Sequence, residues 1–223
     1  MSGAPDSTHD RLGRLAVDVQ RRLEAFYALD PEAPVTEYLV APEEVAHLPG
    51  GGSRMLVAQE GDEVSVGVVL DEAIGTRLER SDPRKQLDSS NLGAFSTVTE
   101  EVSHFLYLLF RARKKRQVTQ LELELQAEVD KYLTAIFFLS LQNEGAVSTR
   151  LRHLLFDRYR LAEGLSAESA ERYHEASRLA NRYCGWLEAR YLRSRRLKDL
   201  AREARRFWRL GQREKLETIA ALH

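Results

Sequence analysis

Three short segments of the sequence place a histidine three residues after a glutamate. Glu101 with His104 and Glu171 with His174 lie in segments of helical periodicity, and a third copy begins at Glu44 in a region broken by prolines. Residues three apart lie on one face of a helix, about one turn from each other. A carboxylate and an imidazole placed in this way can bind the same metal ion.

At the level of this motif, the chain resembles the ferritin-like carboxylate proteins. Those bundles carry Glu-x-x-His on two helices and a single glutamate on each of two others. The resemblance implies bound iron or manganese, and zinc also suits such ligands. The single glutamates are matched by Glu24 and by either Glu124 or Glu128. The predicted metal ligands are Glu101, His104, Glu128, Glu171 and His174, with bridging carboxylates and terminal imidazoles.

The position of two glutamates on their helices favours this prediction. Glu101 lies three residues after Val98 and four before Phe105, and Glu128 lies three residues after Leu125. Both therefore point toward an apolar stripe. A carboxylate there is costly unless it is paired or bound to a cation. Buried or interfacial polar pairs without a metal ion are the alternative interpretation.

A basic segment near the end of the chain raises the possibility of nucleic-acid binding. Residues 190–215 contain 11 Lys/Arg and three acidic residues, with aromatic residues between them. Nucleic-acid surfaces combine such cations with aromatic side chains. Apolar residues recur at helical spacing in the same segment, so the arginines could equally form the solvated face of an amphipathic helix. The arginines available for nucleic acid are Arg195, Arg196, Arg202, Arg205 and Arg206.

Charge is divided unevenly along the chain. Residues 1–100 hold 9 Lys/Arg and 18 Asp/Glu, whereas residues 101–223 hold 24 and 16. Such asymmetry can steer a protein partner or bring two halves of the molecule together. The leading functional prediction is therefore a non-catalytic interaction or regulatory protein that acts through protein contacts or self-association. A metal-dependent oxidase or hydrolase is the first alternative, and a nucleic-acid binder is the second.

The elements that must position these residues are mainly helical. Apolar periodicity and turn residues predict a hairpin over 54–70, centred on Gly61, and helices elsewhere. The predicted helices span residues 10–29, 71–88, 91–116, 118–142, 148–161, 166–192 and 197–210, and the last could continue through Gly211 to the C-terminus. Long helices with short connections favour an antiparallel helical bundle, so we expect a mainly α fold with a small N-terminal β-hairpin. Residues 1–89 would form the helix and hairpin region and residues 90–223 the bundle, within one continuous globular unit.

Other signals are absent from the sequence. It has no Gly-rich phosphate loop, no nucleophile elbow and no secretory signal, and its longest apolar run is too short to span a bilayer. A single cysteine, Cys184, is best interpreted as a buried thiol. We therefore expect a cytoplasmic protein without a membrane partner.

Overall fold

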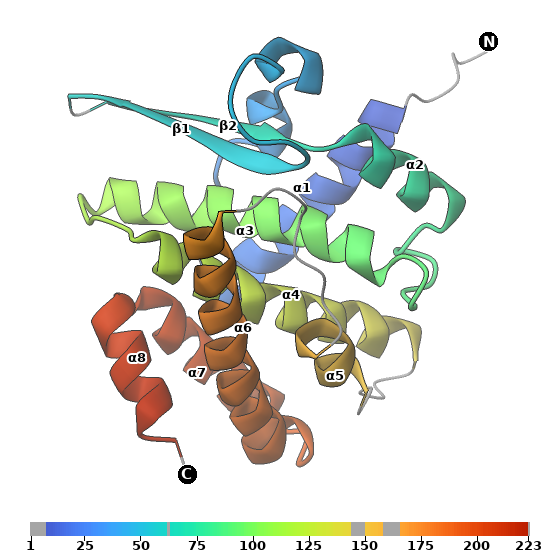
Figure 1. The fold of residues 1–223 in the computed structure, drawn as a ribbon. Coiled ribbons are helices and arrows are strands. Elements are labelled where there is room, and N and C mark those ends of the chain that lie inside the picture. The colour runs from blue at the N-terminus through green and yellow to red at the C-terminus, as the bar shows by residue number, and fades with distance from the viewer. Residues whose placement is uncertain (1–7, 62, 144–149, 158–165, 223) are drawn as a thin grey trace.

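The computed structural model of the protein describes residues 8–61, 63–143, 150–157 and 166–222 (Figure 1). The described residues form eight α-helices, a two-stranded antiparallel sheet and three shorter helical segments. The helices are α1 (Thr8–Tyr27), α2 (Glu72–Arg80), α3 (Leu92–Arg113), α4 (Gln120–Gln142), α5 (Leu151–Phe156), α6 (Ala167–Leu187), α7 (Leu197–Arg209) and α8 (Gln212–Ala220), and the strands are β1 (Arg54–Glu60) and β2 (Glu63–Val69). The shorter segments are η1 (Val35–Tyr38), η2 (Pro42–Val45) and η3 (Glu188–Leu192).

Helices α3 and α4 form the centre of the fold. Ser103 of α3 donates a hydrogen bond to Asp130 of α4 at 2.6 Å, and Tyr107, one turn further along α3, donates to Glu122 at 2.6 Å. Residue numbers therefore rise along one helix while they fall along the other, so the two helices are antiparallel. Thr119 begins α4 as its N-cap, accepting from the Glu122 amide at 3.1 Å. This register determines which side chains meet between the two helices.

The remaining helices enclose this pair. Helix α1 packs against α2, α3, α4 and α7, and α6 packs against α4. Figure 1 shows α6 running across α3 and α4 rather than alongside them. One buried hydrophobic core includes residues from α1, the hairpin and all the long helices, with Val19, Val68, Phe95, Tyr132 and Trp208 among its members.

The hairpin lies over one side of α3 and then extends beyond it (Figure 1). Arg54 is paired with Val69 and Glu60 with Glu63, and Gly61 takes the positive φ of 61° that the turn requires. Val68 at the helix-covered end is fully buried. The opposite end of the hairpin is exposed to solvent.

The structure confirms the expected mainly α fold with a small hairpin. The predicted continuation of the last helix to the C-terminus was wrong. The helix from Leu197 does not continue through Gly211, because Leu210 is extended with ψ of 149°. Gly211 instead begins α8, and its amide donates to Glu214 at 2.9 Å. Leu197, the first residue of α7, is 58% exposed. Of the helix expected over 148–161, only Leu151–Phe156 is seen, and the segments at either end lie outside the described residues.

A buried polar network attaches α8 to α3 and α4. Lys215 of α8 is fully buried, and its ammonium group donates to the side-chain oxygen of Gln126. The same ammonium lies 4.8 Å from the ring centroid of Tyr107 and 4.5 Å from that of Phe207. Burial lowers the pKa of Lys215 to about 7, although the nearby carboxylates of Glu122 and Asp130 oppose this effect.

Asp130 is the carboxylate at the other end of this network. It accepts hydrogen bonds from Tyr27 of α1, from Ser103 of α3 at 2.6 Å and from Gln126 at 3.0 Å. Burial raises its pKa to about 6 in spite of these donors. The network therefore joins α1, α3, α4 and α8 through buried hydrogen bonds.

Lys215 should make the stability of the protein depend on pH above neutrality. Between pH 7 and 10.5 the unfolded chain holds a proton on this lysine that the folded chain does not, so the free energy of unfolding should rise with pH, by at most about 1.4 kcal/mol per unit. Lys215→Met should remove this contribution, which urea unfolding at pH 7, 8.5 and 10 would measure. The exposed control Lys198→Met should keep the wild-type slope. Equal slopes in Lys215→Met and wild type would show that Lys215 is not the group that titrates.

Candidate metal centre

The candidate centre lies between α3 and α4. Among the described residues, Glu100 and His104 of α3 and Glu124 of α4 form the only group of three acidic, histidine or cysteine side chains whose ligand atoms all lie within 4.8 Å of one another. Glu100 and His104 are four residues apart and share one face of α3. The antiparallel register brings Glu124 opposite them. Three potential ligands therefore converge from two helices at the centre of the fold.

His104 is the side chain around which the centre is arranged. Its Nε2 lies 3.5 Å from Glu124 Oε2, and its Nδ1 lies 3.9 Å from Glu101 Oε2. The side chain is 9% exposed, and Nε2 has no hydrogen-bond partner. Burial alone would lower the pKa of His104, but the carboxylates of Glu101 and Glu124 raise it well above its usual value. Without a metal ion, the imidazole is held as a cation by carboxylates that approach it without good hydrogen-bond geometry.

A lysine extends the centre along the two helices. Lys131 of α4 donates to Glu100 at 2.9 Å and to Glu128 at 2.6 Å, and all three side chains are largely buried. The two carboxylates raise the pKa of Lys131 against the effect of burial. Burial would raise the pKa of Glu100, but Lys131 and His104 lower it. Lys131 therefore compensates Glu100 and Glu128.

The centre contains more negative than positive charge. Four carboxylates face one ammonium and one imidazole, so even with His104 protonated the six side chains have a formal excess of two negative charges. Burial raises the pKa of Glu101 and of Glu128, and Glu101 Oε2 has no hydrogen-bond partner. Desolvation disfavours the charged form of these carboxyl groups, and the neighbouring cations His104 and Lys131 only partly oppose this effect. The centre is therefore suited to an additional cation.

Tyr173 of α6 lies against the same group of carboxylates. Burial raises its pKa, and the negative charges of Glu124, Glu100 and Glu101 raise it further. Its phenol therefore remains protonated at neutral pH and can act only as a neutral donor to a carboxylate. The sequence pattern did not assign Tyr173 to the predicted site.

The predicted ligands are divided between two places. Glu101, His104 and Glu128 are buried at the centre, whereas Glu171 and His174 lie exposed on α6. The inward stripe of α6 runs through Ala176, Ala180 and Tyr183, and it reaches the centre at Tyr173, one residue before His174. The five predicted residues therefore do not surround one point.

Glu24 does not contribute to the centre. It accepts hydrogen bonds from Gln20 at 2.8 Å and from the Glu32 amide at 3.0 Å, which secures the segment after α1. The Glu-x-x-His pattern selects Glu101 and therefore overlooks Glu100. The four-residue spacing between Glu100 and His104, which also places two residues on one helix face, is the sequence signal that could have identified Glu100.

Comparisons with models of protein families, with curated proteins and with solved structures found no match to this chain. None of the described helices combines the length and the apolar character needed to cross a membrane.

Removal of Lys131 should reveal how strongly the centre depends on internal charge compensation. In metal-free protein, Lys131→Met leaves Glu100 and Glu128 buried beside each other without their shared cation, so the free energy of unfolding should fall by about 3–5 kcal/mol. Chemical unfolding at pH 7 measures this loss. The exposed control Lys198→Met should change stability by less than about 0.5 kcal/mol. A loss no larger than that of the control would mean that Lys131 does not balance these carboxylates.

Proposed function

We propose that the protein binds a divalent transition-metal ion between α3 and α4, with Glu100, His104 and Glu124 as ligands. The observation that carries this proposal is the environment of His104 Nε2. This buried nitrogen has no hydrogen-bond partner, and it belongs to the group whose ligand atoms lie within 4.8 Å of one another. A metal ion would take the place of the imidazolium proton and would offset the excess negative charge.

The ligand types limit the identity of the ion. One imidazole and two carboxylates suit zinc, manganese or iron, whereas calcium and magnesium prefer oxygen ligands alone. Glu101 and Tyr173 would lie in the surrounding shell, where hydrogen bonds orient the ligands. Lys131 would continue to hold Glu100 and Glu128.

Three protein ligands would leave coordination positions for water or substrate. Catalytic metal sites have this arrangement, whereas structural zinc sites are closed by four protein ligands. A bound ion lowers the pKa of its water or binds oxygen, so the proposed activity is that of a metal-dependent hydrolase or oxidase. The cytoplasmic location expected from the sequence stays a prediction.

Two substitutions by glutamine at proposed ligands, compared with two at exposed residues of α6, test the assignment of the metal ligands. After removal of metal with a chelator and reconstitution with zinc, manganese or ferrous iron, elemental analysis should find about one equivalent per chain. Glu124→Gln and His104→Gln should weaken binding at least about tenfold, since each removes a direct ligand. His174→Gln and Glu171→Gln should bind as the wild type does, because both residues are exposed on α6.

Thermal unfolding provides a second readout that does not depend on activity. A bound ion stabilises the folded state, so saturating metal should raise the melting temperature of the wild type and of His174→Gln, but not that of Glu124→Gln. Circular dichroism would establish that each variant is folded. Failure of the wild type to bind any of the three ions would contradict the proposal. The centre would then be a cluster of ion pairs without a metal ion.

Contact with a protein partner remains a second candidate because of one observation. Val57 is 51% exposed and Val64 is 40% exposed on the end of the hairpin that extends beyond the helices (Figure 1). Val57 is paired with Val66 and Val64 with Gln59, so both valines lie on the same face of the sheet. Exposed apolar side chains on a projecting sheet are typical of interaction surfaces.

Binding of nucleic acid also stays a prediction, and most of the arginines proposed for it make contacts within the chain. Arg196 and Arg202 pair with Asp199, and Arg206 pairs with an acidic residue one turn earlier. Arg205 donates to the backbone carbonyl oxygen of Phe26 at 2.6 Å. These contacts favour a role for the basic segment in attaching α7 to α1 and in stabilising α7 itself.

A further inference from the structure

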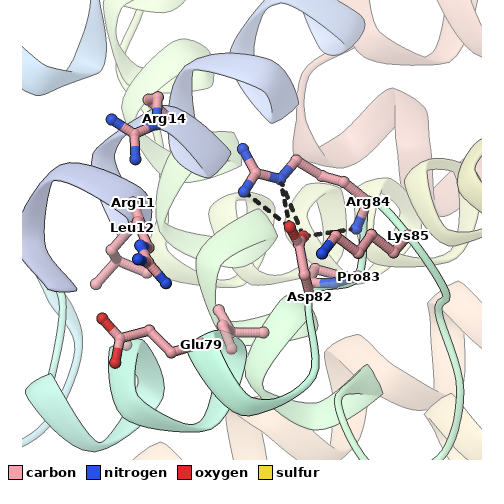
Figure 2. A pocket seen from close by; sticks show the side chains of 10 residues that line it. Arg11, Leu12, Arg14, Glu79, Asp82, Pro83, Arg84 and Lys85 are labelled. Atoms are coloured by element: carbon pink, nitrogen blue, oxygen red, sulfur yellow. Dashed lines mark hydrogen bonds and ion pairs between the residues drawn. The ribbon is translucent and has the colours of Figure 1, made fainter. Parts of the chain in front are cut away.

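A pocket of about 250 Å³ opens between α1, α2 and the segment that follows α2. Figure 2 shows basic side chains around it: Arg11 and Arg14 extend from α1, and Arg84 and Lys85 come from the segment after α2. Two acidic residues, Glu79 and Asp82, also line it. Four basic and two acidic side chains therefore line the pocket, so its lining is mainly basic.

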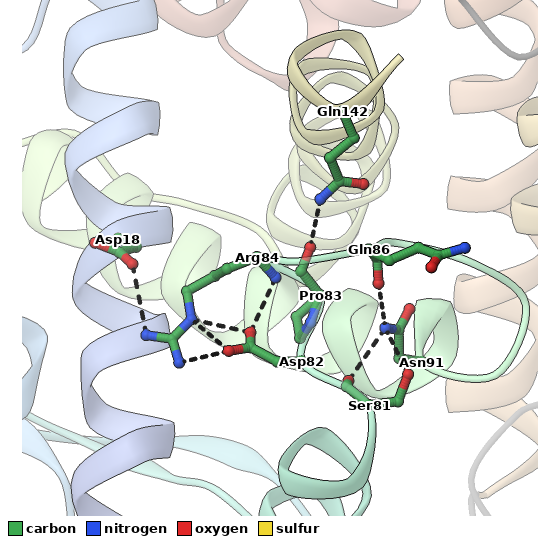
Figure 3. A network of polar contacts seen from close by, with 8 residues as sticks. All are labelled: Asp18, Ser81, Asp82, Pro83, Arg84, Gln86, Asn91 and Gln142. Atoms are coloured by element: carbon green, nitrogen blue, oxygen red, sulfur yellow. Dashed lines mark hydrogen bonds and ion pairs between the residues drawn. The ribbon is translucent and has the colours of Figure 1, made fainter.

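The Arg84 guanidinium group is held in place from two sides. Its Nε donates to Asp82 Oδ1 at 2.9 Å and its Nη2 donates to Oδ2 at 2.9 Å, while Nη1 lies 4.0 Å from Asp18 of α1 (Figure 3). Burial would raise the pKa of Asp82, but hydrogen bonds from Arg84 lower it below its usual value. Asp82 is thus an ionised partner that orients Arg84 rather than an acid poised to titrate.

Two amide side chains, one from α4 and one from the residue before α3, hold the backbone of the segment that follows α2. Gln142 of α4 donates to the carbonyl oxygen of Pro83 at 2.7 Å, and Asn91, next to α3, donates to those of Gln86 at 2.7 Å and Ser81 at 3.1 Å (Figure 3). Asn91 is fully buried. A segment without regular secondary structure is therefore anchored at both ends, which reduces the entropic cost of ligand binding.

We propose that this pocket binds the phosphate group of a small phosphorylated ligand. Arg11 and Arg14 are three residues apart and so lie on one face of α1, and a guanidinium group offers five N–H donors in a planar arrangement that matches phosphate oxygens. The volume exceeds that of a single phosphate group, which leaves room for a small attached part against the buried side chains of Leu12, Leu78 and Pro83. The pocket shares no residue with the candidate metal centre, so phosphate binding does not require a bound metal ion.

Glu79 gives the proposal a distinctive consequence. Its carboxylate points toward Arg11 in Figure 2, where it would repel an incoming anion. Glu79→Gln should therefore tighten phosphate binding several-fold, whereas Arg14→Gln and Arg11→Gln should each weaken it at least about tenfold. Arg21→Gln is the matched control, since Arg21 is an exposed arginine of the same helix that does not line the pocket.

Isothermal titration calorimetry at low ionic strength tests these expectations with inorganic phosphate, glycerol phosphate and succinate as probes. We expect saturable binding of one phosphate or glycerol phosphate per chain in the millimolar range or tighter, with Arg21→Gln unchanged. Tighter binding of glycerol phosphate would identify the ligand as an ester, and tighter binding of inorganic phosphate as the free anion. Binding of neither probe, equal binding of succinate, or an equal loss in Arg21→Gln would overturn the proposal.

Discussion

The fold depends on how charge is accommodated between α3 and α4. Six ionisable side chains lie largely buried along this interface, and burial of an ion without compensation costs several kcal/mol. Compensation requires the antiparallel register that places His104 opposite Glu124 and Lys131 beside Glu100. A shift of one helical turn between α3 and α4 would separate these partners. The buried charges therefore help to specify the register in which the two helices pack.

Two polar clusters on α4 differ in how far their charges and hydrogen-bonding groups are satisfied by neighbouring side chains. Asp130 accepts three hydrogen bonds and lies near Lys215, whose charge lowers its pKa against the effect of burial, so it needs no further partner. The cluster around His104 retains excess negative charge and two buried atoms without hydrogen bonds. Natural structures tend to keep such unsatisfied groups where a ligand or ion completes them. This contrast is why the proposed metal site is placed at His104 and not at Asp130.

The sequence predicted the fold well because its signals are local. The turn at Gly61 and the caps at Thr119 and Ser166 depend on neighbouring residues, so the hairpin and the starts of α4 and α6 follow from the chain itself. The continuation through Gly211 was wrong because a glycine within a helical pattern does not reveal whether the next turn restarts at a new angle.

The candidate site was only partly predictable because it depends on contacts between helices. Burial of Glu101 and Glu128 followed from the apolar stripes of α3 and α4. The placement of Tyr173 rather than His174 against the carboxylates depends on the way α6 crosses the central pair, which periodicity does not encode. Lys215 was hidden in a basic segment, and only its contacts with α3 and α4 distinguish it from the solvated arginines around it.

Anomalous X-ray diffraction from crystals of the protein reconstituted with zinc or manganese is the most direct measurement of the central claim. The proposal predicts one strong anomalous peak between α3 and α4, within about 2.0–2.2 Å of His104 Nε2 and of an oxygen of Glu100 and Glu124. A peak between the side chains of Glu171 and His174, or ordered protein with no peak near His104, would contradict it.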